Sequence, residues 1–200
     1  MLAPWLAGCA SWPTLGTPLD RVDPAHGYRL GATDRPRHGD DLRVVASFSG
    51  GGMRAAALAH GALRELAATP LGDGRSLLDE LDVVSGVSGG AVVAAYFALD
   101  RQRYSREFEP RFLHRNVARE LWWAMLNPLT MLRLASHRYA RGDLYAEHLD
   151  RRLFEGARFG ELARAPDAPF VILNATDLGV GARFEFTQDL FDAICLDLEP

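Results

Sequence analysis

The sequence predicts an α/β fold with a mainly parallel central sheet. Its 200 residues suit one domain, and its content of 48% hydrophobic and 24% charged residues is that of an ordinary globular protein. Between residues 42 and 99, segments typical of buried strands alternate with Ala-rich helical segments in the order β-α-β-α. That order is typical of parallel strands joined by right-handed helical crossovers.

The first 41 residues are expected to form a separate N-terminal segment ahead of a domain at residues 42–200. Residues 6–9, Leu-Ala-Gly-Cys, resemble a bacterial lipobox, in which the cysteine is acylated and anchors a lipoprotein. No basic residue precedes Cys9, and the apolar run before it is shorter than in secretory signals. Two alternatives remain: a lipoprotein whose true start lies upstream, or a chance match in an untidy tail. Residues 10–41 are rich in Pro, Gly, Asp and Arg and are expected to be an extended lead-in.

Two strand-turn-helix units follow. Residues 42–48 are apolar and β-branched and predict a buried strand, which three glycines separate from a helix over residues 53–68. The same order recurs in a strand over residues 82–85, a glycine-rich turn and a helix over residues 91–99. Both turns are therefore expected to follow the carboxyl ends of parallel strands.

The second half of the chain predicts a helical insert and two more strands. Residues 105–155 are expected to be helical, with breaks at Pro128 and near Gly142. Residues 169–176 predict a third strand, and residues 183–187 predict a fourth that runs antiparallel after a glycine turn. An apolar stretch without a recognisable terminal helix follows, which favours the N-terminal portion of a larger domain.

Residues 86–90, Gly-Val-Ser-Gly-Gly, match the pattern G-x-S-x-G between a predicted strand and a predicted helix. A sharp turn of this kind forces Ser88 into a strained backbone conformation and exposes its hydroxyl to substrate. Small residues must stand on both sides because the turn brings them together. The alternative is a tight turn with an exposed serine and no catalytic role.

Residues 49–54, Ser-Gly-Gly-Gly-Met-Arg, form the second glycine motif. Three glycines between a strand and a helix can direct several backbone N–H groups to one point, which makes a site for a phosphate or an oxyanion. A flexible loop is one alternative. A dinucleotide fold is another, because Gly50, Gly52 and Ala55 satisfy G-x-G-x-x-A, but the next strand ends in Ser85-Gly86 instead of the acidic residue which that fold expects.

In combination, the two motifs resemble those of the patatin-like phospholipase family. The glycine loop of that family begins with Asp, where this chain has Ser49, and we expect the change to be tolerated because the glycine amides bind the oxyanion. The resemblance extends over residues 42–197. Three further segments contribute to it: residues 60–63, 174–177 and 184–186.

The resemblance implies a three-layer α/β/α hydrolase with a Ser–Asp dyad. Ser88 would attack an ester carbonyl of a lipid and form an acyl-enzyme. The amides of Gly50, Gly51 and Gly52, aided by that of Gly89, would stabilise the oxyanion. Lipid or other ester substrates and a membrane surface would be the partners, and no cofactor or metal is implied.

The catalytic Asp of the family belongs to an Asp-Gly motif well downstream of the serine. The only Asp-Gly pair here, Asp73-Gly74, precedes Ser88. We therefore expect the base to lie outside these 200 residues, and this stretch alone to be inactive or nearly so. A catalytically silent lipid-binding or scaffolding lipoprotein is the alternative to the hydrolase, with the dinucleotide-binding protein as a minor one.

Several residues have both a functional and a structural interpretation. Arg54 could bind a lipid phosphate or support the glycine loop. Trp122-Trp123 could contact a membrane interface, line an acyl groove or pack on the domain core. The six histidines lack metal-site spacing, and each is expected to be structural or solvated.

The charge and the N-terminus bear on partners and location. All 22 basic residues are Arg, the net charge is −4, and no basic stripe points to nucleic acid. No stretch has the roughly 18 apolar residues of a membrane-spanning helix. If Cys9 is acylated, the protein belongs to the bacterial cell envelope, and the cytoplasm is the alternative.

Overall fold

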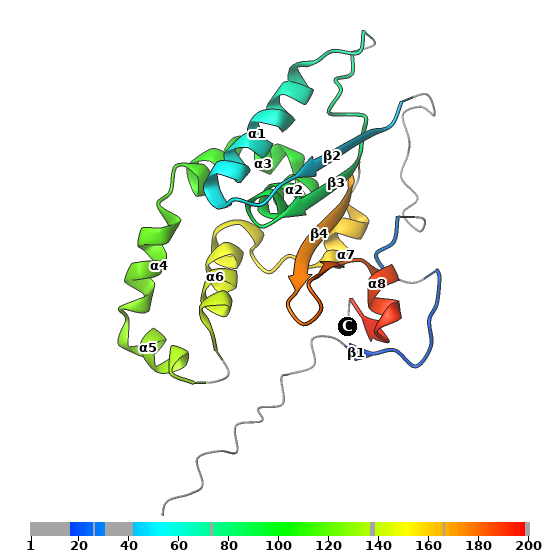
Figure 1. Cartoon of the computed structure of the whole chain (residues 1–200). Helices are drawn as coiled ribbons and strands as arrows, with labels where there is room; N and C mark the ends of the chain where they lie inside the picture. Colours follow the sequence, from blue (N-terminus) through cyan, green and yellow to red (C-terminus); the bar gives the residue numbers. More distant parts are fainter. Residues whose placement is uncertain are drawn as a thin grey trace, which may run out of the picture.

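The computed structural model describes residues 17–25, 27–30, 42–72, 74–136, 139–165 and 167–198. At its centre lies a four-stranded sheet in the order β2-β3-β4-β5, with the helices gathered around it (Figure 1). Strands β2, β3 and β4 are parallel, and β5 is antiparallel to β4. The α/β class and the mainly parallel sheet are confirmed. The strands are β2 (Val44–Phe48), β3 (Leu81–Val87), β4 (Phe170–Asp177) and β5 (Ala182–Glu185).

The helices follow the predicted order and extend it. The described parts of residues 101–154 are helical apart from short breaks, one of them directly before Pro128. The π-helical turn η1 (Glu109–Leu113) contains Pro110, whose missing N–H interrupts the regular α-helical ladder. The helices are α1 (Gly52–Ala68), α2 (Gly89–Leu99), α3 (Arg101–Phe108), α4 (Val117–Met125), α5 (Pro128–Leu134), α6 (Arg141–Leu149), the π-helical η2 (Asp150–Phe154), α7 (Phe159–Arg164) and α8 (Gln188–Ala193).

Helix α2 is the central buried element. Its sequence, GGAVVAAYFAL, has no charged residue, and nearly all of its side chains are buried. A helix that is apolar on all sides is stable only when neighbours surround it. It packs against β3 and β4 on one side, and against α1 and α3 on others. The residue that precedes it, Ser88, is therefore attached to a helix that neighbouring elements enclose.

The other face of β2 and β3 is more open. Val45 pairs with Val83 and Ser47 with Ser85, so these four side chains share a face. Val45 and Ser47 are exposed, and Val83 and Ser85 are half-buried. The described residues thus supply the sheet and a helical layer over one face of it.

Two segments differ from what the sequence predicts. The lead-in contributes Tyr28 to the core, where its side chain is 1% exposed, although the surrounding residues have no apolar period. The short strand β1 (Thr17–Pro18) also pairs with β6 (Leu196–Asp197), near the other end of the chain. Helix α8 lies where no terminal helix was expected, because its six residues are too few to show a helical period in the sequence.

The Tyr28 side chain is expected to contribute measurably to stability. Its ring stacks on Phe170 with centroids 4.5 Å apart, and its hydroxyl accepts a hydrogen bond of 2.7 Å from the Val171 N–H. Tyr28→Phe keeps the stack but leaves that buried N–H without this partner, so we expect a loss of about 1–3 kcal/mol in the free energy of unfolding. Urea denaturation of the parent and the variant measures this loss. An unchanged midpoint would show that the hydrogen bond makes no net contribution to stability.

Candidate active site

The two glycine motifs lie at the carboxyl ends of neighbouring parallel strands. Strand β2 ends at Phe48 and α1 begins at Gly52, while β3 ends at Val87 and α2 begins at Gly89. Phe48 pairs with Gly86 in the sheet. The strand-to-helix turns are therefore adjacent, and in open α/β sheets ligands bind at this edge.

Ser88 occupies the single position between β3 and α2, with φ 52° and ψ −118°. A positive φ is rare for a residue with a side chain, and it costs of order 1–3 kcal/mol. Only a closely packed surrounding keeps such a residue in place. The side chain of Ser88 is exposed. The backbone strain expected of an exposed nucleophile at a sharp turn is thus present.

The glycines beside Ser88 are required by close packing. A Cβ on Gly86 would lie 2.7 Å from the backbone N and Cα of Ala91. A Cβ on Gly90 would lie 2.7 Å from both the Cβ and the carbonyl oxygen of Phe48. Both distances are shorter than real carbon contacts. The turn thus tolerates only hydrogen at these two positions, as the G-x-S-x-G pattern predicts.

The triple-glycine loop lies against Ser88. A Cβ built on Gly50 would be 3.5 Å from the Cβ of Ser88. A Cβ built on Gly89 would be only 2.1 Å from the carbonyl oxygen of Gly52, so the two turns touch through their backbones. Ser88 and the loop were expected to share one site, and the structure brings them together.

Backbone N–H groups are available at this point. Gly51 and Gly52 have φ values of 142° and 64°, which favour glycine, and they turn the chain from β2 into α1. The first N–H groups of α1 and α2 have no partner within their own helices. In the described part of the chain, no group accepts a hydrogen bond from the N–H of Gly50 or Gly51. Two helix N-termini therefore direct positive partial charge toward the neighbourhood of Ser88.

Among the described residues, none forms a hydrogen bond with the Ser88 hydroxyl as a general base would, and this includes every carboxylate. Asp177, at the end of β4, instead accepts a 2.7 Å hydrogen bond from the N–H of Gly179 and stabilises the β4–β5 turn. The expectation that the base lies outside these 200 residues stays a prediction.

Asn174 is a site-supporting residue to which sequence reasoning assigned no role. Its Nδ2 donates to the Ser85 Oγ at 2.9 Å and to the carbonyl oxygens of Gly86 and Ile172 at 3.0 Å each. It thereby ties β4 to the last residues of β3, directly before the turn at Ser88. Its Oδ1 is buried and has no hydrogen-bond partner among the described residues. An amide in the otherwise apolar start of β4, FVILN, was the available signal.

The other candidate residues lie in different settings. Arg54 is exposed on the first turn of α1, while Cys9 lies outside the described residues.

His60 is buried, and its ring nitrogens lie 2.7 Å from the Tyr104 hydroxyl and 2.9 Å from the Glu109 Oε1. The hydrogen bond with His60 lowers the pKa of Glu109 below its ordinary value. These contacts agree with a structural role for His60.

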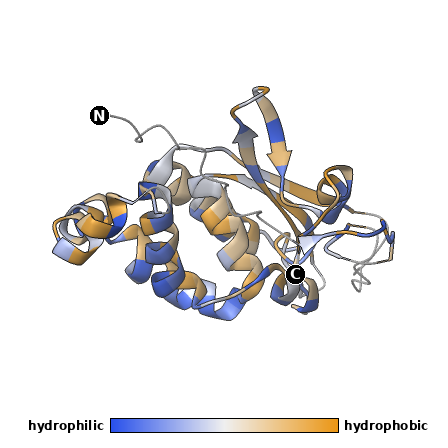
Figure 2. Ribbon diagram, turned by 90° about the horizontal axis from the view of Figure 1, so that it is seen from below, coloured by the Kyte–Doolittle hydropathy of each residue, from blue (hydrophilic) through white to orange (hydrophobic). Residues whose placement is uncertain are grey.

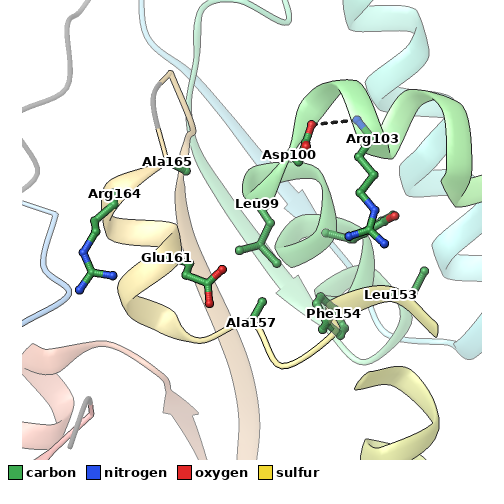
Figure 3. Close-up of a pocket in the computed structure, with 10 residues that line it drawn as sticks. Leu99, Asp100, Arg103, Leu153, Phe154, Ala157, Glu161, Arg164 and Ala165 are labelled. Carbon is green, nitrogen blue, oxygen red and sulfur yellow. Dashed lines mark hydrogen bonds between the residues drawn. The ribbon is translucent and has the colours of Figure 1, made fainter. Parts of the chain in front are cut away.

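A cavity of about 350 Å³ lies at the far end of α2 from Ser88 (Figure 3). Tyr96, Leu99, Arg103 and Glu161 are among its lining residues. Leu99 is ten residues beyond Gly89, or about 15 Å along the helix axis. This cavity is therefore separate from the glycine turns and does not belong to the candidate site.

Arg103, which lines this cavity, forms hydrogen bonds with two carboxylates. These bonds lead us to expect that its contribution to the stability of the fold depends on pH. Its hydrogen bonds are the main cause of the lowered pKa values of Glu107 and Glu155, whose ordinary value is 4.5. A carboxyl whose pKa is lowered by folding stabilises the folded state at pH values above its pKa in the unfolded chain. This contribution is lost as the pH falls through its pKa in the folded state. Arg103→Gln should therefore cost more stability at about pH 6 than at about pH 3. Urea midpoints at both pH values test this, and an equal difference at both would contradict it.

The comparisons with known proteins support the likeness seen in the motifs. A family model described as patatin-like phospholipase matches residues 46–196, more than half of the 200-residue chain, and the match includes both glycine turns. No curated protein and no solved structure matches the chain.

Among the described residues, no three His, Cys, Asp or Glu side chains gather as a metal site would require. None of the helices in the described ranges has the length and apolar content needed to cross a membrane.

Proposed function

Since the chain belongs to the patatin-like phospholipase family, we propose that it hydrolyses carboxylic esters of lipids through a covalent acyl-enzyme on Ser88. The family supports a lipid acyl hydrolase in general. The observation that supports the specific mechanism is the contact between the two turns. A Cβ built on Gly50 would lie 3.5 Å from the Cβ of Ser88, and a Cβ built on Gly89 would lie 2.1 Å from the carbonyl oxygen of Gly52.

In the proposed reaction, the Ser88 Oγ attacks the ester carbonyl carbon and loses its proton to a base. The carbonyl π electrons move onto the oxygen, which becomes an oxyanion. When the tetrahedral intermediate collapses, the C–O bond to the alcohol breaks and the alcohol leaves with a proton. Water then attacks the acyl-enzyme by the same route, releasing the fatty acid and restoring Ser88.

The amides of Gly50, Gly51 and Gly52 are the proposed oxyanion donors, with the amide of Gly89 at the start of α2 as an assisting donor. Loss of one such donor typically costs about 2.7–4 kcal/mol of transition-state stabilisation. Because these donors belong to the backbone, Ser49 in place of the family's Asp does not remove any of them. Arg54, exposed on the first turn of α1, is the proposed contact for a lipid phosphate.

The base is proposed by family resemblance to be an Asp of an Asp-Gly motif beyond the present residues. Without such a group, Ser88 would be a weak nucleophile, and the site would hold lipid without turnover. A silent lipid-binding or scaffolding protein is thus the second candidate function. The absence of a carboxylate on the Ser88 hydroxyl among the described residues is the observation that favours it.

A fluorophosphonate probe distinguishes the two candidates on the protein from its full natural reading frame. We expect covalent labelling, with the added mass on the peptide that contains Ser88, because such probes react with activated serines. The Ser88→Ala variant controls for labelling elsewhere. A folded protein that takes up no probe would support the lipid-binding alternative.

We also propose that the protein is a lipoprotein of the bacterial cell envelope, anchored through Cys9. Each buried CH₂ of an acyl chain adds about 0.8 kcal/mol of membrane affinity, so several chains hold a protein firmly. Mass spectrometry of the N-terminal peptide, from membranes of cells that express the full reading frame, tests this. An unmodified Cys9 excludes the anchor and favours the cytoplasm.

A further inference from the structure

Helices α4 and α5, residues 117–134, form an arm with many large apolar side chains on its surface. The side chains of Trp122 and Trp123 are 65% and 69% exposed. Of the three interpretations of this pair, packing on the domain core is therefore wrong for the described structure. Four further apolar residues of the arm are exposed: Leu126, Leu129, Met131 and Leu132. Single exposed apolar residues are ordinary, but a continuous group marks an interaction site.

Helix α4 has two distinct faces. Its inner face places Val117 in the core, and Glu120 accepts a hydrogen bond of 2.9 Å from Arg152. At 100° per residue, Trp122, Trp123 and Leu126 fall within one outer stripe. Arg119, one turn earlier, lies on the same stripe and is exposed. The outer face thus combines indole rings with a cation, and the inner face holds the helix to the protein.

The charge of the arm is opposite to that of the chain. Residues 117–134 contain Arg119 and Arg133 against one acidic residue, Glu120, a net charge of +1, whereas the whole chain has a net charge of −4. Arg133, on α5, is paired with Glu147 of α6, and its guanidinium lies 3.9 Å from the Tyr139 ring centroid. Since Arg133 is held by Glu147, the exposed Arg119 is the cation that the arm presents beside its apolar outer stripe, and it complements an anionic partner.

The arm lies on the side of the molecule that holds the candidate site. Figure 1 shows α4, α5 and α6 on the side toward which the carboxyl ends of β2 and β3 point. In Figure 2 the helices farthest from the sheet carry hydrophobic residues along much of their ribbon. A flat partner that contacts the arm would therefore approach the turns around Ser88 from the same direction.

We propose that this arm docks on the surface of a lipid bilayer rich in anionic lipids. Indole rings favour the boundary between headgroups and acyl chains, because one part of the ring is apolar and its N–H remains hydrated. Arg side chains nearby pair with lipid phosphates. The proposal rests on the proposed lipid hydrolase, for which the arm would deliver substrate, but the binding itself requires no catalysis.

Flotation with vesicles tests the proposal on the protein from its full natural reading frame, with Cys9→Ser so that no acyl chain can anchor it. One vesicle type is pure phosphatidylcholine, and the other contains roughly one third phosphatidylglycerol. We expect at least tenfold tighter binding to the anionic vesicles. Trp122→Ala/Trp123→Ala should weaken that binding at least tenfold. The matched control is Leu58→Ala/Val45→Ala, which removes two side chains that are 73% and 63% exposed elsewhere, and it should bind as the parent does.

Hydrolysis of a monomeric short-chain ester separates failure of the docking surface from failure of the proposed function. The tryptophan variant should keep the parent's rate on this substrate while it loses vesicle binding. Equal binding of parent and tryptophan variant, or no vesicle binding by the parent, overturns the proposal. A third outcome also overturns the proposal: the parent sediments as a dimer, the tryptophan variant sediments as a monomer, and vesicle binding is unchanged. The arm is then an interface between two copies of the chain. Vesicle binding without ester hydrolysis retains the docking surface and removes the hydrolase.

Discussion

Ser88→Gly is expected to abolish lipid ester hydrolysis and, at the same time, to stabilise the fold. The loss of activity follows because the proposed nucleophile disappears, and in serine hydrolases such a loss lowers kcat by roughly 10⁴-fold or more. The gain in stability follows from the backbone. Ser88 has φ 52°, which glycine adopts without a Cβ penalty, so relief of that strain is expected to add about 1–2 kcal/mol once the greater backbone entropy that glycine loses on folding is subtracted.

Ser88→Ala separates the two effects. Alanine also lacks the hydroxyl, but it retains the Cβ and therefore the strain of a positive φ. We expect kcat to fall as far as in Ser88→Gly, while the urea midpoint stays close to that of the parent. The difference in unfolding free energy between the two variants measures the strain at this turn, less the greater backbone entropy that glycine loses on folding.

Three measurements are needed on the protein from its full natural reading frame: kcat on a lipid ester, urea denaturation and circular dichroism. The last shows that both variants are folded. If Ser88→Ala retains activity within tenfold of the parent, Ser88 is not the nucleophile. If Ser88→Gly is less stable than Ser88→Ala by about the 0.5–1 kcal/mol that the entropy of glycine costs, the positive φ does not store strain.

The sequence predicted the part of the fold that local patterns determine. Strands β2 and β3 and helices α1 and α2 are long or strongly apolar, and their glycine turns have a fixed spacing, so both the order and the parallel pairing followed. The antiparallel β5 followed from its glycine turn. The adjacency of the two turns was predictable as well, because the ends of neighbouring parallel strands meet at one edge.

What the sequence could not predict depends on contacts between distant residues. Tyr28 becomes a core residue through the ring of Phe170 and the N–H of Val171, more than 140 positions away, and nothing near it signals burial. The role of Asn174 depends on the same kind of contact with Ser85. The exposure of Trp122 depends on which face of α4 packs, and an aromatic pair alone does not decide that.

Gly89→Ala is expected to separate the two turns and impair both stability and activity. The new Cβ would lie 2.1 Å from the carbonyl oxygen of Gly52 and 2.9 Å from its carbonyl carbon, so the backbone of the loop must move. Overpacking of this kind typically costs about 1–3 kcal/mol of stability. Because displacement of the loop also moves the proposed oxyanion donors, we expect kcat to fall by about 10²–10³-fold.

Gly61→Ala is the matched control for this variant. Gly61 is an exposed interior residue of α1, and a Cβ there meets nothing within 4 Å. Because alanine loses less backbone entropy than glycine in a helix, we expect a gain of about 0.5–1 kcal/mol and unchanged kcat. The two substitutions are chemically identical and both lie in helices that begin at the site, so opposite effects indicate the close contact that the added Cβ makes with Gly52. Equal urea midpoints and equal rates for the two variants would mean that the two turns do not touch in solution. Gly52 would then not be an oxyanion donor next to Ser88.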